Sequence, residues 1–475
     1  MMPFTPLPDW AARSVMYQIF PDRFDREEGR APSDHINTPW NGPYTHHSMT
    51  GGNLDGIIRR LDYLEDLGVN LLWLNPILES PSCHKYDTAD YTRVPRHFGG
   101  DKALRRLMKK AHAKGIRVIL DAVCGHCSTE HSGFKDLLKK QEQSAYRNWF
   151  QVRQFPVARS DRSGFNHTYE CWHGHPGLPR FNTKDERVAD YLIGSYEYLM
   201  KAFDVDGYRL DAIETISLNF WERFYERMKE IRPDCLLLGE IWTRDYRFID
   251  PPRMDTLTDF PFLWLLVNDP GLRKMKAEEF AVKTVIHRDQ LPETHRDAMC
   301  CFLSNHDMRR IASRPGVTKK RLNMLYSILL TWPGLPCIYY GDEIGMRGAE
   351  PPDSRNAMNW HEEEWNNGLR LYIRDLIRLR RREVSLTGGP FAWIYANNET
   401  GIAVFARGEG GERIATALHL GGTRPPGDLG ALLHGAGWEI REVLHPVSRE
   451  PQAPVVLKPE SAVVIRLRQR IQQNL

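Results

Sequence analysis

The apolar positions along the chain alternate between two spacings, which predicts helices and strands in turn. Over 54–67, apolar residues recur every three or four positions, as in an amphipathic helix, and Gly68 marks its expected end. A basic amphipathic helix is expected around 102–114. The neighbouring segments are short and apolar on both faces, which is typical of buried strands in a parallel sheet. The first three strands are expected at 15–20, 69–74 and 117–121.

The alternation stops once and then continues. From 127 to 182 the chain is polar, aromatic and irregular, which is too long for a strand-to-helix loop, so we expect a small inserted subdomain there. Helices expected at 187–203 and 218–231 resume the pattern. The remaining strands are expected at 205–211, 236–240, 256–262, 302–307 and 336–343. Eight strands that alternate with helices predict an α/β fold, a closed (β/α)8 barrel.

The character of the chain changes again after about residue 388. Short alternating runs separated by Gly and Pro indicate a small antiparallel β domain, expected as a β-sandwich. The predicted architecture is thus a (β/α)8 barrel with an inserted subdomain after the third strand and a C-terminal β domain. The expected boundaries are 1–126 and 183–387 for the barrel, 127–182 for the insert and 388–475 for the C-terminal domain.

Carboxylates stand at the ends of several of the predicted strands. Asp121, Asp211, Glu240 and Asp307 each end an apolar run, and His126 lies just beyond the first of them. An α/β barrel keeps its chemistry at the C-terminal ends of its strands, so these side chains are expected at one rim. Several carboxylates at one rim are what the cleavage of a glycosidic bond requires.

Composition and charge narrow the partners and the setting. A formal net charge of +3 gives no reason to expect nucleic acid or an anionic membrane as a partner, and no apolar stretch is long enough to span a bilayer. A chain of 475 residues needs neither disulfides nor a metal to fold. The eight Cys are scattered and the first ten residues lack a secretory pattern, so we expect a reduced, cytoplasmic setting.

Five stretches carry a resemblance to a known family, and in chain order they lie at 17–24, 121–126, 207–211, 239–242 and 302–307. The chain resembles the α-amylase superfamily of retaining glycoside hydrolases along nearly its whole length, to about residue 470. Within that superfamily, Leu-Pro-Arg-Phe-Asn at 178–182 is similar to a motif of the neopullulanase, cyclomaltodextrinase and maltogenic amylase group.

The resemblance implies roles for the three catalytic carboxylates, and the chemistry agrees with them. Asp211 would be the nucleophile, and Arg209 on the same strand face would hold its charge. Glu240 would be the acid and then the base, which requires a raised pKa. Asp307 would stabilise the transition state by binding sugar hydroxyls. Substrate-binding roles are implied for Tyr86, Asp121, His126, Arg209, Trp242, His306 and Arg355.

Two departures from the family pattern bear on metal and assembly. Many relatives have Asn where this chain has Gly125, and that Asn contributes to a calcium site. Gly125 has no side-chain oxygen, so calcium is not expected at the usual site. No other cofactor is expected. The neopullulanase group also has an N-terminal β domain that builds its dimer, whereas the first strand here is expected near residue 15. We therefore expect a monomer or a weak homo-oligomer.

The expected activity is hydrolysis of α-1,4-glucosidic bonds in maltooligosaccharides, with cyclodextrins, pullulan and starch as further substrates. Three alternatives stay open: a transglycosylase or isomerase that uses the same intermediate, a non-catalytic binding subunit, and activity on α-1,6 bonds. The intact set of acids disfavours the second, and the motif at 178–182 disfavours the third. The Cys-Gly-His-Cys run at 124–127 resembles a metal motif, but no second Cys pair stands at zinc spacing.

Overall fold

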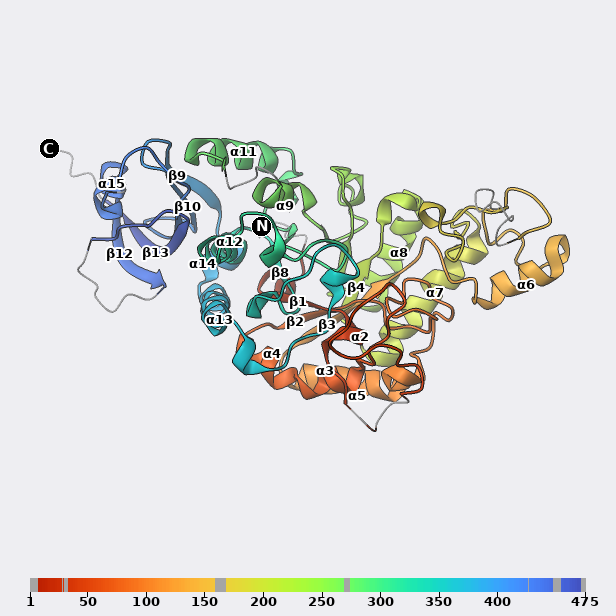
Figure 1. Cartoon of the computed structure of the whole chain (residues 1–475). Helices are drawn as coiled ribbons and strands as arrows, with labels where there is room; N and C mark the ends of the chain where they lie inside the picture. The colour runs from red at the N-terminus through yellow and green to blue at the C-terminus, as the bar shows by residue number, and fades with distance from the viewer. Residues whose placement is uncertain are drawn as a thin grey trace.

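The protein consists of a barrel, an insert on one side of it and a C-terminal domain on the other. The computed structural model describes residues 7–27, 29, 33–158, 168–268, 274–425, 427–446 and 454–470. Figure 1 shows the C-terminal domain (blue) on one side of the barrel and the insert that contains α6 (orange-yellow) on the other. Among the helices in these ranges, none is both long and apolar enough to cross a bilayer.

Eight parallel strands form the barrel, which confirms the predicted fold class. Their order is β6-β5-β4-β3-β2-β1-β8-β7, and a parallel bridge between Thr258 and Cys300 joins the two ends of this order. Gly207 opens β4 where the backbone of β5 leaves no room for a side chain, since a Cβ there would lie 2.0 Å from the Leu236 carbonyl oxygen. The strands are β1 Met16–Ile19, β2 Leu71–Leu74, β3 Arg117–Ala122, β4 Gly207–Leu210, β5 Leu236–Gly239, β6 Thr256–Leu257, β7 Cys300–Phe302 and β8 Leu335–Tyr339.

Apolar side chains on both faces of these strands build two cores. Met16, Leu71, Ile119, Leu236 and Cys300 belong to a cluster that fills the barrel interior. The neighbouring positions on the strands face the surrounding helices and belong to a larger core between sheet and helices. This explains why the strand segments read as continuous apolar runs.

Helices surround the barrel, and one of them differs from its prediction. The helix expected over 54–67 is two helices, because Arg60 leaves the helical conformation and lies between α3 and α4. The helices of the barrel are α3 Leu54–Arg59, α4 Leu61–Leu67, α5 Gly100–Ala113, α7 Glu186–Phe203, α8 Leu218–Ile231, α9 Phe260–Val267, α11 Ala277–Asp289, α12 Lys319–Thr331, α13 Asn367–Arg382 and α14 Val384–Gly388, with the short α1 Asp9–Ala12 and α2 Pro21–Phe24 near the N-terminus.

The sixth strand is much shorter than the predicted 256–262. It spans only Thr256–Leu257, and α9 begins at Phe260. The Asp259 side chain accepts a hydrogen bond from the Phe262 backbone N–H, and Pro261 occupies the first turn, so the helix starts where the strand was expected to continue.

The insert and the C-terminal domain are built differently. The insert contains α6 Ser132–Lys140 and several isolated bridges, among them His126–Arg180 and Phe150–Phe181. The described C-terminal strands form one five-stranded antiparallel sheet of order β12-β13-β11-β10-β9, not the two stacked sheets of the expected sandwich. The helix α15 covers one face of this sheet, while Phe405 on the other face packs against Trp332 of the barrel. The elements are β9 Phe391–Asn397, β10 Ile402–Arg407, β11 Glu412–His419, α15 Leu429–Gly435, β12 Trp438–His445 and β13 Ser461–Gln469.

Candidate active site

The predicted carboxylates gather at the C-terminal rim of the barrel. Asp121 is the last residue but one of β3, and Asp211 and Glu240 directly follow β4 and β5. Asp307 lies in the loop after β7. The parallel register pairs Asp121 with Arg209, so the ends of β3 and β4 stand side by side. Strands that end at the same level therefore bring acids from distant parts of the chain into one site.

The guanidinium group of Arg209 joins three of these acids. Its Nη1 donates to Asp121 Oδ1 and to Asp211 Oδ1, both at 2.8 Å, and its Nη2 lies 2.7 Å from Glu240 Oε1. Arg209 itself is fully buried. A buried arginine shared in this way holds Asp211 and Glu240 close to each other and fixes their orientation.

The electrostatic balance of this cluster leaves excess negative charge. Burial raises the pKa of Asp121, Asp211 and Glu240, while Arg209 lowers the pKa of each. One guanidinium offsets one of three negative charges, so the cluster retains protons to a higher pH than separate carboxyl groups would. The coupled groups titrate as a unit.

Ala212 contributes a further fixed contact. It adopts a left-handed conformation with φ 43°, which is uncommon for a residue with a side chain. Its backbone N–H donates to Glu240 Oε2 at 3.0 Å. The strained turn after Asp211 therefore anchors the second carboxylate as well.

A second layer of hydrogen bonds supports the cluster from below. The Tyr86 hydroxyl donates to Asp121 Oδ2 at 2.8 Å and lies 2.6 Å from His306 Nε2. The Gln18 amide donates to His306 Nδ1 at 2.8 Å, which assigns the ring proton to Nε2. Burial lowers the pKa of His306 to about 3, so the ring is neutral at physiological pH.

Asp307 is held by two partners on the opposite side of the site. Arg355 Nη2 donates to its Oδ1 at 2.9 Å, and His306 Nε2 lies 3.0 Å from its Oδ2. Burial alone would raise the pKa of Asp307, but His306 and Arg355 outweigh that effect and hold it below the ordinary value. Asp307 is thus an ionised acceptor.

A cavity of about 820 Å³ opens over these side chains. A volume of this size is within the range of small-molecule sites. The predicted residues Asp121, Arg209 and His306 do not line it but lie beneath, where they hold the lining residues in place. The other seven predicted site residues all line it: Tyr86, His126, Asp211, Glu240, Trp242, Asp307 and Arg355.

The insert supplies one wall of the cavity, which the sequence did not assign to particular residues. His126 stacks on Trp172 of the insert, with ring centroids 5.1 Å apart. Neither ring nitrogen of the buried His126 has a hydrogen-bond partner among the described side chains, although both are polar. Buried polar atoms are normally paired, so these nitrogens are available to a ligand in the cavity. The lining residues outside the ten assigned to the site are His46, for which the sequence left a cleft position and a surface-loop position equally open, and His84, Trp172, His173, His175, Leu178, Ala212, Glu214 and Thr215.

Gly125, where the sequence gives no reason to expect calcium, makes a backbone contact with the insert. The Gly125 carbonyl oxygen accepts a hydrogen bond from the Phe181 N–H at 3.1 Å, which ties β3 to the insert. A Cβ at Gly125 would lie 3.3 Å from Thr215 Oγ1, so a longer side chain would meet its neighbours. The described residues contain no group of three or more His, Cys, Asp or Glu side chains placed to hold a metal ion.

Comparisons with known proteins identify the family of the chain. Residues 18–378 match the family described as "Alpha amylase, catalytic domain". The chain is 37% identical over 413 residues to a cyclomaltodextrinase of Geobacillus thermopakistaniensis, a match that covers 87% of this chain and 69% of that protein. It is 36% identical over 425 residues to neopullulanase 2 of Thermoactinomyces vulgaris, a match that covers 88% of this chain and 71% of that protein.

A solved structure extends the similarity to almost the whole chain. Cyclic α-maltosyl-(1→6)-maltose hydrolase from Arthrobacter globiformis superposes with a TM-score of 0.85 at 28% identity. The superposition covers 97% of this chain and 99% of that one.

Proposed function

The chain belongs to the α-amylase family of glycoside hydrolases, and we propose that it cleaves α-1,4-glucosidic bonds in maltooligosaccharides with retention of configuration. The observation that carries this proposal is the shared guanidinium of Arg209, which binds Asp211 and Glu240 at 2.8 and 2.7 Å. Retaining enzymes need their two carboxyl groups only about 5–5.5 Å apart, whereas inverting enzymes leave room for a water.

The proposed reaction has two displacement steps. In the first, an Asp211 oxygen bonds to the anomeric carbon while the glycosidic bond breaks, and Glu240 gives its proton to the leaving oxygen. In the second, Glu240 takes a proton from water, whose oxygen bonds to the anomeric carbon and releases Asp211. Burial raises the pKa of both acids, and the first step requires that the retained proton is on Glu240 and the charge on Asp211.

The remaining residues are placed to bind the sugar. Asp307, kept ionised by Arg355, can accept hydrogen bonds from hydroxyls and offset positive charge that develops on the ring. Tyr86 and the unpaired nitrogens of His126 face the same cavity. No step requires a metal or an organic cofactor, and we propose that none is used.

Short substrates are proposed over polymeric starch. The insert residue Trp172 stacks on His126 and lines one side of the cavity, which supports a walled site for small oligosaccharides. The relatives named cyclomaltodextrinase and neopullulanase support the same class. Water and a sugar hydroxyl compete for the covalent intermediate, so transfer to sugar is the second candidate. The exposed Trp242, on the side of Glu240, favours it.

The test is a product profile and a stereochemical readout. We expect kcat/KM per bond to be higher for maltotetraose and β-cyclodextrin than for soluble starch, with pullulan as a further substrate. NMR of the first product should show the α-anomer. A β-configured first product would overturn the double displacement, and starch turning over several-fold faster would show an endo-acting enzyme with an open cleft.

The pH dependence of hydrolysis follows from the raised pKa values in the acid cluster. Turnover needs Asp211 charged and Glu240 protonated, so kcat/KM should rise as the first loses its proton and fall as the second does. Because burial raises the pKa of Glu240 above its ordinary 4.5, the alkaline fall should lie above that pH. Measuring kcat/KM for maltotetraose from acid to alkaline pH checks this. A value that stays constant into alkaline solution would contradict the acid role.

Chelation is expected to change little. Gly125 offers no side-chain oxygen, and its carbonyl is already bonded to Phe181. We therefore predict that EDTA leaves hydrolysis and the melting temperature nearly unchanged. A fall of about ten degrees, which calcium restores and magnesium does not, would show a calcium site at other oxygens.

A further inference from the structure

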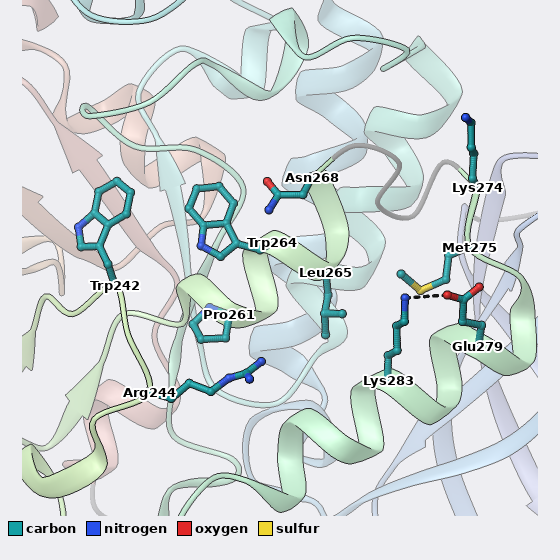
Figure 2. A pocket seen from close by; sticks show the side chains of 10 residues that line it. All are labelled: Trp242, Arg244, Pro261, Trp264, Leu265, Asn268, Lys274, Met275, Glu279 and Lys283. Atoms are coloured by element: carbon teal, nitrogen blue, oxygen red, sulfur yellow. Dashed lines mark ion pairs between the residues drawn. The ribbon is translucent and has the colours of Figure 1, made fainter.

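A second cavity lies on the outer side of Trp242. It measures about 540 Å³ and is lined by residues of the loop after β5, of α9 and of α11, among them Trp242, Arg244, Pro261, Trp264, Glu279 and Lys283 (Figure 2). Trp242 also lines the catalytic cavity, so the two cavities share a wall. The second cavity, called the groove below, therefore adjoins the catalytic cavity at Trp242.

The direction of the groove is fixed by Glu240. The Trp242 indole N–H donates to Glu240 Oε1 at 3.3 Å. In the proposed reaction Glu240 protonates the leaving oxygen, so the leaving part of the substrate must lie on its side. The groove beyond Trp242 continues along that leaving-group side.

Two tryptophans form an aromatic surface along the groove. The Trp242 and Trp264 ring centroids are 6.1 Å apart with their planes inclined by 41°, and Figure 2 shows the rings side by side. Phe260 supports both, at 4.0 Å from Trp242 and 5.7 Å from Trp264. Trp242 is 42% exposed, which is unusual for so large an apolar side chain. Inclined rings suit successive sugars of an α-1,4-linked chain, because that chain curves.

The groove offers basic hydrogen-bond donors beside its apolar faces, because Arg244 and Lys274 both line it. Lys283 is paired with Glu279 at 2.6 Å, so its charge is offset. Arg244 is exposed and has no hydrogen bond or ion pair with the described residues, and Figure 2 shows its guanidinium reaching toward the groove below Pro261. One free guanidinium beside two indoles provides donors for hydroxyl groups together with apolar faces for sugar rings.

We propose that this groove binds the sugars of an α-glucan beyond those at Trp242, with Trp264 as a stacking platform and Arg244 as a hydroxyl donor. The inference rests on the proposed function, since it extends the leaving-group side of that site. Its consequence is a preference for substrates, and for acceptors in transfer, that place three or more sugars on that side.

The kinetic test compares substrates of two lengths. Maltotriose can leave at most two sugars on the side of Glu240, whereas maltohexaose can leave more. For Trp264→Ala and for Arg244→Ala, the ratio of kcat/KM for maltohexaose to that for maltotriose should fall about five- to tenfold, through KM. Tyr198→Ala and Arg247→Ala are the matched controls, because Tyr198 is 43% exposed on α7 and Arg247 is paired with Asp245. Both controls should keep the wild-type ratio.

A binding measurement separates this inference from the proposed reaction. Calorimetry with the Asp211→Asn protein should show weaker maltohexaose binding when Trp264 or Arg244 is also replaced, with maltotriose binding affected much less. If the wild-type protein hydrolyses no α-glucan but this difference in binding is found, the reaction is wrong and the groove stands. If both variants lose the two substrates equally, or lose neither, the groove proposal is overturned. Arg244→Ala removes an exposed side chain, so it tests the groove even if Trp264→Ala does not fold.

Discussion

Asp211→Asn is expected to abolish hydrolysis of maltooligosaccharides, with a loss of at least about 10³-fold in kcat, or ~4 kcal/mol of barrier. The amide is nearly the same size as the carboxylate, but it is a poor nucleophile and cannot form the ester-linked intermediate. Initial rates on maltotetraose with the purified variant provide the measurement. A variant that kept more than about a hundredth of the wild-type rate would exclude Asp211 as the nucleophile.

The same substitution should not lower the stability of the protein, so unfolding could not explain the loss of activity. Burial, opposed by Arg209, raises the pKa of Asp211 well above its ordinary value. A group whose pKa is higher in the folded protein loses folding free energy when it ionises, so at neutral pH the charged Asp211 destabilises the fold. Asn carries no charge, and the melting temperature of the variant should equal or exceed that of the wild type. An inactive variant with a lowered melting temperature would not test the nucleophile.

Much of the fold follows from the sequence because its signals are local. Short runs that are apolar on both faces appear as barrel strands, and the interruption after β3 appears as the insert. The misplaced sixth strand had a usable signal, since Asp259 and Pro261 are typical of a helix start. The single C-terminal sheet had no such signal in the sequence, because alternation along a strand does not tell whether a helix or a second sheet covers its face.

The site was predictable to the extent that it stands at strand ends. Asp211 and Glu240 could be placed at one rim from topology alone. The contact of one arginine with three carboxylates could not be predicted, since it depends on the register between β3, β4 and β5. The insert wall around Trp172 is equally a matter of tertiary packing, because nothing in an irregular polar segment indicates which aromatic side chain faces the cavity.

The same arrangement explains why the site is costly to maintain and how it is stabilised. Three acids around Arg209 repel one another, and a left-handed Ala212 adds backbone strain. Offsetting contacts come from the network of Tyr86, His306 and Gln18 beneath. Function and stability therefore oppose each other at Asp211, whereas in the layer below Gln18 and His306 support the site and Tyr86 also lines the cavity.

Glu240→Gln is expected to separate the two chemical steps, because glutamine can neither give nor take the proton. On maltotetraose, whose leaving oxygen needs protonation, kcat should fall by about 10²–10⁴-fold. α-Maltosyl fluoride needs no proton on its leaving group, so Asp211 should still displace fluoride, in a burst equal to the amount of enzyme. Turnover should then stall, since no base activates water to release the sugar from Asp211.

Azide provides the decisive control for that variant, because this anion attacks carbon without losing a proton. Added azide should restore turnover of α-maltosyl fluoride by Glu240→Gln and give an α-configured glycosyl azide, whereas Asp211→Asn should show neither burst nor rescue. The difference follows from the roles alone, since both side chains bind the same guanidinium at 2.8 and 2.7 Å and lie in the same cavity. Equal rescue of both variants by azide would show that Asp211 and Glu240 do not divide the nucleophile and acid–base roles between them. The absence of a burst from both variants would show the same.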